Sequence, residues 1–540
     1  MTLVDEPVTF TATRARRPGI GTTGPDKLPL DAGEQYRFSF DMGACIGCHS
    51  CEVACAEQNA NPVGVNWRRV GEVEGGTFPN AVRLNLSMAC NHCIEPTCLS
   101  GCPTNAYVKL ENGIVAHHAD DCIGCQYCIW NCPYEVPVFN PERRVVTKCD
   151  MCQPRLAAGE SPACVDACPT RAITVEKVNV AAWRLDHQQA DAPGLPSSEI
   201  TMSTTRIILP ESMPADTRSV VHDRVEPADP HWPLVALTLL TQFSLGILGA
   251  SVILRALSSG AAAGRGFAIA GAAAGAGAMA LAASVLHLGR PAAAWKALRN
   301  LRHSWLSREV ALFAAFSAAT FAYAGASLMW SQARGPVLAL GVAAALLGAT
   351  GVYASGRLYL VPARPVWNSP RTVVAFFATA LATGPLLGVI LVGRRAEGVG
   401  LLFAVAALGS LVQLAVVQHL VASIVARKER EFALTARLLF GRFRLLFVIR
   451  VVVTLAALGT CAWAALAGAG VSSVAGAGVS SVAGAGSVAG AGAGGGTPAG
   501  AGLAVAALVL AGLGELIGRY LFFVTVTPMT AARRFSAGAK

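Results

Sequence analysis

The stretch CIGCHSCEVAC, residues 45–55, carries four cysteines in the spacing C-x-x-C-x-x-C-x-x-x-C. The same spacing recurs at 122–132, and a third group at 90–102 differs only in its wider middle gap. A fourth group, at 149–168, has eleven residues between its second and third cysteines. Proline follows the last cysteine in three groups, and the four groups together contain all but one of the 17 cysteines in the chain.

This repeated spacing is typical of cubane iron–sulfur clusters. Three thiolates on one tight loop suit three irons of a cluster, and the fourth cysteine, before proline, reaches a neighbouring cluster. A zinc site needs four ligands around one ion, usually from two separated C-x-x-C pairs. A disulfide framework gives no reason for one phased pattern to recur four times. The cysteines therefore predict [4Fe-4S] clusters and electron transfer.

The rest of the chain divides by composition. Residues 1–35 are a polar leader whose arginines precede no apolar run, so a secretory signal is not expected. Residues 36–185 hold the cysteines and short strand-like pieces such as AYVKL, and residues 186–230, rich in Asp, Pro and Ser, are predicted to be a linker. The mean hydropathy of +0.48 is high for a soluble protein. Residues 231–530 account for it as a predicted membrane domain, and 531–540 form a tail.

Eight apolar spans follow His231, each long enough to cross a bilayer as a helix, which takes about 20 residues. They are 232–254, 266–286, 310–333, 335–356, 372–393, 398–426, a helix near 446–467 and one near 501–527. Between the last two, residues 468–499 repeat VSSVAGAG among dense glycines. Because each glycine costs a helix about 1 kcal/mol relative to alanine, this segment is predicted to be a low-complexity loop. The predicted fold is an α+β ferredoxin-like four-cluster domain followed by an all-α eight-helix membrane domain.

Basic residues are divided unequally between the two ends of these spans. An even number of spans returns the chain to the face that carries the cysteine domain. The 17 basic residues on that face are Arg290, Lys296, Arg299, Arg302, Arg308, Arg357, Arg364, Arg371, Arg427, Lys428, Arg430, Arg437, Arg442, Arg444, Arg533, Arg534 and Lys540. The five on the opposite face are Arg255, Arg265, Arg334, Arg394 and Arg395.

This bias predicts a multi-pass protein of the cytoplasmic (inner) membrane, with the cysteine domain on the cytoplasmic side. The periplasmic side is the alternative, because a large folded domain can override loop charge. The bias also explains the formal net charge of +10. No basic patch interleaved with aromatic residues predicts nucleic-acid binding.

Over roughly residues 36–210 the chain resembles the four-cluster electron-transfer subunits of molybdenum oxidoreductases, such as dimethyl sulfoxide reductase and respiratory nitrate reductase. The resemblance implies one cluster on each of four ligand sets: Cys45, Cys48, Cys51 and Cys168; Cys55, Cys149, Cys152 and Cys164; Cys90, Cys93, Cys98 and Cys132; Cys102, Cys122, Cys125 and Cys128. Some relatives replace the second cysteine of the third group and hold a three-iron cluster there. Because Cys125 is present, four [4Fe-4S] clusters are expected.

The membrane half carries a second resemblance. Its segments HWPLVALTLLTQ (231–242), SVLHLGRPAAAWKALRNLRHSWLSREV (284–310), FFATALATGPLLG (376–388) and GELIGR (514–519) resemble the membrane anchor subunit of dimethyl sulfoxide reductase. That family implies an eight-helix protein that lacks haem and oxidises menaquinol. The glycine repeat departs from the family pattern. The two subunits, normally separate chains, are fused here, which implies a one-to-one stoichiometry.

His287 and Glu309 are the candidate quinol residues. His287 ends the second span and Glu309 begins the third, so both face the cysteine domain. Quinol oxidation releases two electrons and two protons, and a histidine with a carboxylate can accept the protons. The alternative is a pair of interfacial residues without a quinol role. In the anchor family the matching residues are implicated in quinol binding, so the resemblance favours the quinol site.

Three further features have both a structural and a functional interpretation. Residues 292–306 are predicted to be an amphipathic helix that lies on lipid headgroups or docks the cysteine domain. Glu515 and Arg519 are predicted to form an i,i+4 ion pair, with a proton route or quinone contact as the alternative. His419 with His287 is the one possible haem-ligand pair, but the anchor family lacks haem and none is expected.

The sequence as a whole predicts a non-catalytic subunit of an oxidoreductase complex. It is expected to take electrons from the quinone pool, with menaquinol oxidation as its only half-reaction. Four [4Fe-4S] clusters are expected to pass them to a separate molybdopterin-containing subunit that reduces an S-oxide or N-oxide. The alternatives are a reverse-running chain from substrate to quinone, a polysulfide-reductase-like module and, last, a haem b anchor.

Overall fold

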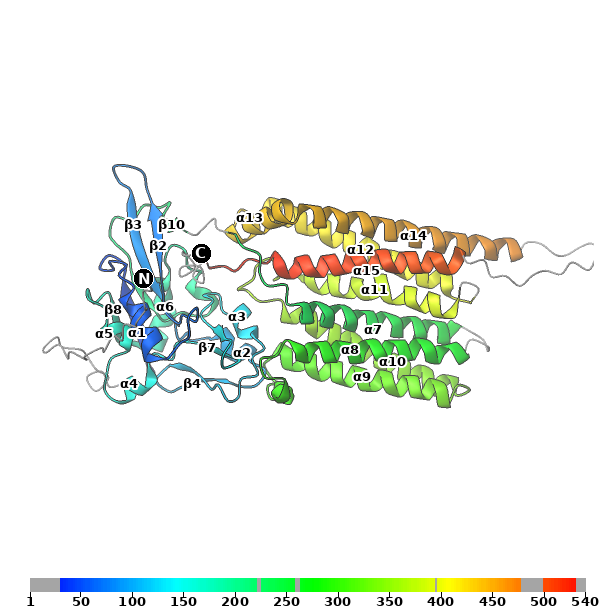
Figure 1. Ribbon diagram of the computed structural model, residues 1–540, viewed down its shortest axis with the longest axis horizontal. Helices are drawn as coiled ribbons and strands as arrows, with labels where there is room; N and C mark the ends of the chain where they lie inside the picture. Colours follow the sequence, from blue (N-terminus) through cyan, green and yellow to red (C-terminus); the bar gives the residue numbers. More distant parts are fainter. Residues whose placement is uncertain (1–29, 221–224, 258–262, 394–395, 477–498, 531–540) are drawn as a thin grey trace, which may run out of the picture.

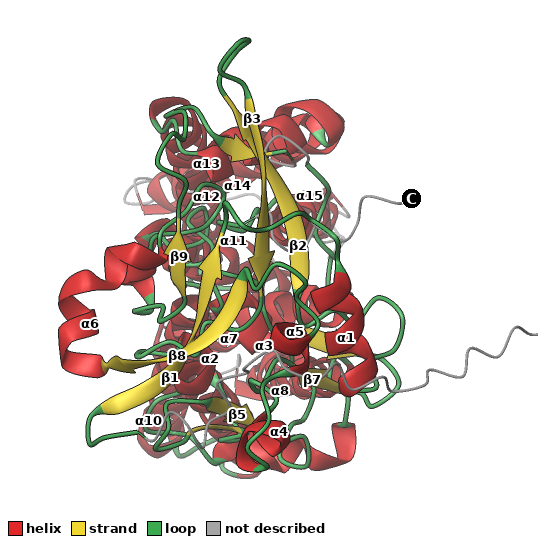
Figure 2. Ribbon diagram, turned by 90° about the vertical axis from the view of Figure 1, so that its left-hand side faces the viewer, coloured by secondary structure: helices red, strands yellow, loops and turns green. Residues whose placement is uncertain are grey.

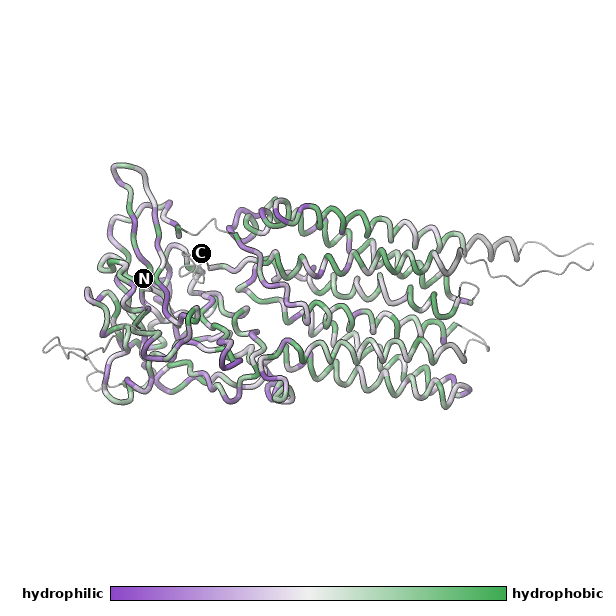
Figure 3. Tube along the Cα trace, viewed as in Figure 1, coloured by the Kyte–Doolittle hydropathy of each residue, from purple (hydrophilic) through white to green (hydrophobic). Residues whose placement is uncertain are grey.

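The computed structural model describes residues 30–220, 225–257, 263–393, 396–476 and 499–530 (Figure 1). A cysteine-rich domain of short strands and helices lies at one end, and a bundle of long helices extends from it. Figure 3 shows that the long helices are largely hydrophobic, whereas hydrophilic segments gather in the cysteine-rich domain and at the helix ends. The predicted tail and most of the predicted leader lie outside the described residues.

The cysteine-rich domain is organised by two three-stranded sheets and two hairpins (Figure 2). In the first sheet, of order β8-β1-β9, β1 pairs antiparallel with β8 and parallel with β9. The second sheet has the order β10-β2-β3. The strands are β1 (Glu34–Asp41), β2 (Arg69–Gly75), β3 (Val82–Met88), β4 (Tyr107–Lys109), β5 (Val115–His117), β6 (Val138–Asn140), β7 (Val145–Thr147), β8 (Ile173–Asn179), β9 (Arg206–Ile208) and β10 (Arg218–Ser219).

The first and third cysteine groups fold alike. In each C-I-G-C segment the glycine has a positive φ, 68° at Gly47 and 70° at Gly124, a conformation that glycine adopts at little cost. The residue after the second cysteine is also left-handed, with φ 58° at His49 and 61° at Gln126. A short helix then begins in each case. The short helices of this domain are α1 (Ser50–Gln58), α2 (Thr97–Gly101), α3 (Tyr127–Asn131), α4 (Gln153–Ala157), α5 (Ala163–Asp166) and α6 (Val180–Asp186).

The predicted linker, 186–230, returns to the cysteine-rich domain before it enters the bundle. Its strand β9 extends the first sheet beside β1, and β10 extends the second sheet beside β2. Trp183, just before the linker, donates its indole hydrogen to the carbonyl oxygen of Ser203 at 2.8 Å. The segment therefore completes both sheets and leads directly into the first long helix.

Eight helices in the described residues are long and apolar enough to cross a membrane, as predicted. They are α7 (Trp232–Leu257), α8 (Ala263–Leu286), α9 (Trp305–Met329), α10 (Arg334–Leu358), α11 (Pro370–Val392), α12 (Val399–Ala426), α14 (Arg444–Gly476) and α15 (Ala499–Val524). The helix α14 continues nine residues into the predicted low-complexity loop, where Ala, Val and Ser alternate with glycine. The rest of that loop, 477–498, lies outside the described residues.

Small residues allow the central helices to approach closely. A Cβ atom on Gly246 of α7 would lie 2.1 Å from the carbonyl oxygen of Ala380 in α11, and one on Gly384 would lie 2.2 Å from Gly246. Only glycine fits at such a crossing, which is the usual way for helices to pack in a membrane. The helix α11 thus lies against α7 on one side and α12 on the other.

Candidate functional site

Two cavities of the cysteine-rich domain are each lined by four cysteines. One, of about 360 Å³, is lined by Cys90, Cys93, Cys98 and Cys132. The other, of about 300 Å³, is lined by Cys45, Cys48, Cys51 and Cys168. All seventeen cysteines are free thiols. In each cavity three cysteines of one group meet a fourth from another group, which is the donor set of one cubane cluster next to a second.

The remaining eight cysteines of the four groups also gather in two sets. The thiol of Cys128 interacts electrostatically with those of Cys125, Cys122 and Cys102. The thiol of Cys55 interacts in the same way with those of Cys152 and Cys164, and Cys149 lies beside Cys55 and Cys164. In both sets, three cysteines come from one of the four sequence groups and the fourth cysteine comes from another group. This is the arrangement that two adjacent cubane clusters require.

Two buried cations accompany the thiols. Arg68 and Lys148 are each only 3% exposed. Arg68 lies within electrostatic range of Cys164 and Cys51, and Lys148 within range of Cys90 and Cys98. A charge is rarely buried without a partner of opposite sign. These cations therefore fit thiolate-ligated clusters, which carry negative charge.

The loop after α8 packs directly on the third cysteine group. A Cβ atom added to Gly124, between Cys122 and Cys125, would lie 2.9 Å from the Cα of Gly289. The backbone N–H of Arg290 donates to the carbonyl oxygen of Ile123 at 3.1 Å. Because Gly124 and Gly289 face each other without side chains, the loop after α8 can lie directly against the backbone of a cluster-binding loop.

His287 and Glu309 both lie near the third cysteine group. The loop that starts at His287 reaches Gly124 two residues later, and Glu309 acts electrostatically on Tyr127, which follows Cys125. Glu309 is 3% exposed. The Oε1 atom of Glu309 and the hydroxyl of Ser355 are buried and lie near each other without a well-aligned hydrogen bond, and the buried Nδ1 atom of His287 lies near the backbone of Ser284.

Burial lowers the pKa of His287 to about 4. The imidazole is therefore neutral near pH 7 and can take part in a hydrogen bond without carrying a charge. Buried polar atoms whose neighbours do not satisfy them with well-aligned hydrogen bonds leave hydrogen-bonding capacity for a ligand. A quinol head, with two hydroxyl groups, supplies donors of the required kind.

Aromatic rings connect the same cysteine group to the bundle. Trp130, in α3, lies 5.3 Å from Trp367 and 6.1 Å from Tyr359 between ring centroids. The hydroxyl of Tyr127 donates to the carbonyl oxygen of Leu358 at 2.7 Å. Tyr127 belongs to the hydrophobic core of the long helices, and Cys125 and Trp130 pack against that core. One side of the third cysteine group, at Cys125, Tyr127 and Trp130, therefore packs into the core of the bundle, whereas Cys122 and Cys128 lie in a separate small core.

Polar contacts complete the interface between the two parts. The side-chain amide of Asn300 donates to the carbonyl oxygen of Cys102 at 2.8 Å. A guanidinium nitrogen of Arg299 lies 2.7 Å from a carboxylate oxygen of Asp121. Arg364, between α10 and α11, forms an ion pair at 3.1 Å with Glu135, and both side chains are almost fully buried. These contacts hold the third cysteine group against the bundle.

The segment predicted to be an amphipathic helix, 292–306, docks on the cysteine-rich domain. It forms the 3-10 helix η4 (Pro291–Leu298), and Lys296 donates to the carbonyl oxygen of Asp120 at 2.8 Å. Trp295 remains exposed. The basic side of the segment therefore contacts the cysteine-rich domain, and its apolar side is free to meet a membrane surface.

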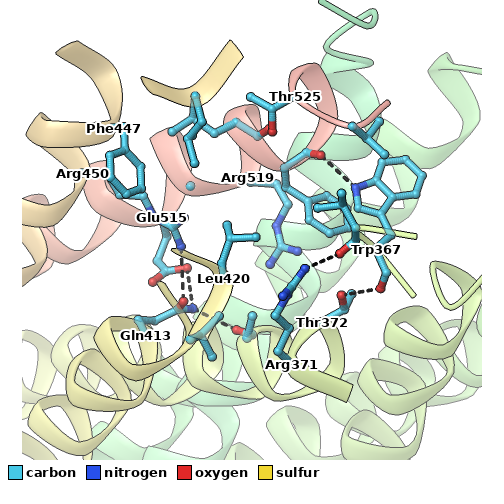
Figure 4. A pocket seen from close by; sticks show the side chains of 18 of the residues that line it. Trp367, Arg371, Thr372, Gln413, Leu420, Phe447, Arg450, Glu515, Arg519 and Thr525 are labelled. Carbon is cyan, nitrogen blue, oxygen red and sulfur yellow. Dashed lines mark hydrogen bonds between the residues drawn. The ribbon is translucent and has the colours of Figure 1, made fainter. Parts of the chain in front are cut away.

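The predicted ion pair between Glu515 and Arg519 is not what the structure forms (Figure 4). Glu515 accepts hydrogen bonds from Thr379 Oγ1 at 2.6 Å and Gln413 Nε2 at 2.9 Å. Arg519 instead donates to Gln242 Oε1 at 2.8 Å. The i,i+4 prediction was wrong because neighbouring helices supply polar partners that one helix's spacing does not show.

His419 and His287 are not brought together. His419 is exposed on α12, whereas His287 follows α8, and these helices lie on different sides of the bundle in both views (Figures 1 and 2). The two histidines therefore do not form a haem-ligand pair in this structure.

The cysteine-rich domain has sets of cysteines suited to iron–sulfur clusters, and one of these sets packs against the bundle of membrane helices. This combination defines a membrane-bound iron–sulfur electron-transfer protein. Residues 82–178 match the family described as "4Fe-4S dicluster domain", and residues 228–483 match "DMSO reductase anchor subunit (DmsC)". The chain belongs to the dimethyl sulfoxide reductase family, and it joins the iron–sulfur subunit and a DmsC-type anchor in one polypeptide.

Three relatives illustrate this membership. One chain of the anaerobic dimethyl sulfoxide reductase of Haemophilus influenzae is 38% identical over 177 residues, which are 31% of this polypeptide and 86% of the relative. The probable anaerobic dimethyl sulfoxide reductase chain YnfG of Escherichia coli K12 is also 38% identical, over 31% of this polypeptide and 85% of its own length. One subunit of the sulfite dehydrogenase of Allochromatium vinosum is 36% identical, over 26% of this polypeptide and 67% of its own length.

Several residues of this site were not found from the sequence. Tyr127, Trp130 and Arg364 join the two halves, and Arg68 and Lys148 lie beside the thiols. Lys148 directly precedes Cys149, which was the only available signal. The others follow no spacing rule, because their partners come from distant parts of the chain.

Proposed function

We propose that the chain oxidises menaquinol beneath the third cysteine group and passes the electrons through four [4Fe-4S] clusters to a molybdopterin-containing catalytic subunit. That subunit would reduce an S-oxide or N-oxide acceptor. The observation that carries the proposal is the packing of the loop after His287 on the loop of Cys122 and Cys125. Together with the electrostatic effect of Glu309 on Tyr127, this packing supports a quinol site next to a cluster-binding segment.

The proposed ligand sets are those that the family resemblance implies. The two four-cysteine cavities and the two electrostatically coupled sets support them. Each cluster would carry one electron at a time. The chain's own residues bind the quinol head, accept its two protons at His287 and Glu309, and keep the site apolar. Each quinol oxidised thus yields two protons and two electrons.

The basic residues on the cysteine-domain side of the helices support a cytoplasmic position for that domain in the inner membrane. A reverse-running chain, from an oxidised substrate to quinone, is the second candidate. It is favoured by the likeness to a subunit of a protein named sulfite dehydrogenase. Purification of the complex would show which molybdenum subunit accompanies the chain, and so which direction applies.

His287→Ala and Glu309→Gln test the quinol site. Each is expected to slow menaquinol-driven cluster reduction by about 10²–10⁴-fold, the usual contribution of a positioned acid or base. Reduction by dithionite and the cluster absorbance should stay unchanged. His303→Ala is the matched control, because His303 is an exposed histidine of the same loop. Normal menaquinol-driven reduction in both variants would refute the quinol role of these residues.

A further inference from the structure

A cavity of about 740 Å³, counting its open mouth, lies among α11, α12, α14 and α15 (Figure 4). Its walls are mostly apolar, with aromatic side chains such as Trp367 and Phe447. Its charged lining consists of three arginines and one carboxylate: Arg371, Arg450, Arg519 and Glu515. The cavity therefore has a formal excess of two positive charges.

The carboxylate does not neutralise the arginines by direct contact. Its hydrogen-bond donors are the neutral side chains of Thr379 and Gln413. Among the described residues, no carboxylate oxygen lies within 4.0 Å of the guanidinium groups of Arg371, Arg450 and Arg519. Cationic groups held in an apolar wall favour an anionic partner.

The arginines are also positioned by their surroundings. Arg371 donates to the carbonyl oxygen of Val366 at 2.6 Å. Arg450 lies across α15 at Gly518, where a Cβ atom would be 2.7 Å from the guanidinium carbon. The Nε atom of Arg519 is buried without a partner among the described residues. Figure 4 shows the guanidinium groups of Arg371 and Arg519 near each other. That of Arg519 also donates to Gln242 and lies 3.9 Å from the ring centroid of Phe376, so Arg371 and Arg450 are better placed to meet a ligand.

The cavity lies at the depth of lipid headgroups. Arg371 is the second residue of α11, and Arg519 lies five residues before the end of α15, or about 8 Å at 1.5 Å per residue. The flanking helices expose apolar side chains to their surroundings, such as Leu411 on α12 and Val448 on α14. In a bilayer these surfaces contact acyl chains, so a lipid can approach the mouth without crossing water.

The neighbouring segment attracts the same class of ligand. Residues 427–444, which connect α12 to α14, have a net charge of +4, from two glutamates, Glu429 and Glu431, and six basic side chains: Arg427, Lys428, Arg430, Arg437, Arg442 and Arg444. Basic clusters of this size next to a membrane helix concentrate anionic lipids, and basic pockets between helices bind their headgroups. The charge near the cavity therefore favours an anionic lipid over a zwitterionic one.

We propose that this cavity binds one anionic phospholipid, with its phosphate at Arg371 and Arg450 and its acyl chains along the apolar walls toward α12 and α14. A quinone head would match the aromatic walls, but it is uncharged and leaves the excess positive charge unanswered. The proposed site lies between other helices than His287 and Glu309, so it does not depend on the proposed quinol site.

The experiment is lipid titration of the full chain in detergent, followed by native mass spectrometry. Phosphatidylglycerol is the probe, and phosphatidylcholine, inorganic phosphate and a soluble menaquinone analogue are the comparisons. The wild-type chain should retain about one phosphatidylglycerol, and Arg371→Gln with Arg450→Gln should weaken it at least about tenfold, because charge-assisted hydrogen bonds are lost. Arg442→Gln with Arg444→Gln, which removes the same charge outside the lining, is the matched control.

Each outcome decides the proposal. Selective phosphatidylglycerol binding that only the cavity variant loses would support it. Equal binding of phosphatidylcholine, equal loss in the control variant, or displacement by inorganic phosphate or the menaquinone analogue would overturn it. Should the glutamine variant lose its clusters, Arg371→Lys with Arg450→Lys preserves the charge. Binding by that variant should then weaken as sodium chloride screens the charges, and binding insensitive to salt would contradict the proposal.

Discussion

Cys125→Ala is expected to remove about one to four irons per chain and to slow menaquinol-driven reduction of the remaining clusters at least about a hundredfold. Cys125 packs against the core of the membrane bundle, so its cluster is the proposed point of entry for electrons. A three-iron centre in its place would have a different net charge and potential. A change of about 120 mV shifts a one-electron equilibrium about a hundredfold.

Iron analysis and the rate of cluster bleaching after menaquinol addition would measure this effect. The matched control is Cys461→Ala, because Cys461 is the cysteine outside the four groups and lies buried in α14. Cys48→Ala, at an exposed cysteine of the first group, should lower iron while leaving menaquinol-driven reduction of the third group intact. If Cys125→Ala behaved like Cys48→Ala, electrons would have to enter elsewhere.

Arg364→Met is expected to weaken the joint between the two halves by about 3–5 kcal/mol, the usual cost of breaking a buried ion pair from one side. Glu135 would remain buried with a charge and without this partner, since the pair is almost fully excluded from solvent. Hydrogen exchange should therefore rise in α3 and in the segment between α10 and α11. Menaquinol-driven cluster reduction should fall while reduction by dithionite is retained.

The double variant Arg364→Met with Glu135→Met distinguishes the loss of this ion pair from a general disruption of the fold. Two apolar side chains of similar length can replace a buried pair at little cost, so the double variant should recover most of the lost protection. A coupling energy from the four proteins would measure the interaction. Independent, additive effects of the two substitutions would show that the pair does not hold the joint together.

Local patterns were enough to predict the architecture. The cysteine spacing carries its own chemistry, because three ligands of a cubane lie within about a dozen residues. The eight membrane helices follow from length and hydropathy, and the structure confirms them. The sequence also predicted that His287 and Glu309 lie at helix ends on the side of the cysteine-rich domain. That side can be worked out for each helix end by counting the membrane spans that precede it.

Features that depend on tertiary contact did not follow from the sequence. The Asp-, Pro- and Ser-rich segment 186–230 was predicted to be a linker that wraps or tethers, and its composition did not show that its strands β9 and β10 complete two sheets. Glu515 and Arg519 have the spacing of a helical pair, yet Thr379, Gln413 and Gln242 of three other helices are their hydrogen-bond partners. Only the packed bundle brings those residues together.

The short connection between β10 and α7 affects how strongly the cysteine-rich domain is held against the helix bundle. Each of the two dimethyl sulfoxide reductase relatives aligns with 31% of this polypeptide, in which about a dozen residues between β10 and α7 tether the cysteine-rich domain to the bundle. A short tether gives the docked surfaces an effective concentration in the millimolar range. The tether therefore adds to the buried contacts of Tyr127, Trp130 and Arg364, and keeps the surfaces at the joint together even when one of these contacts is lost.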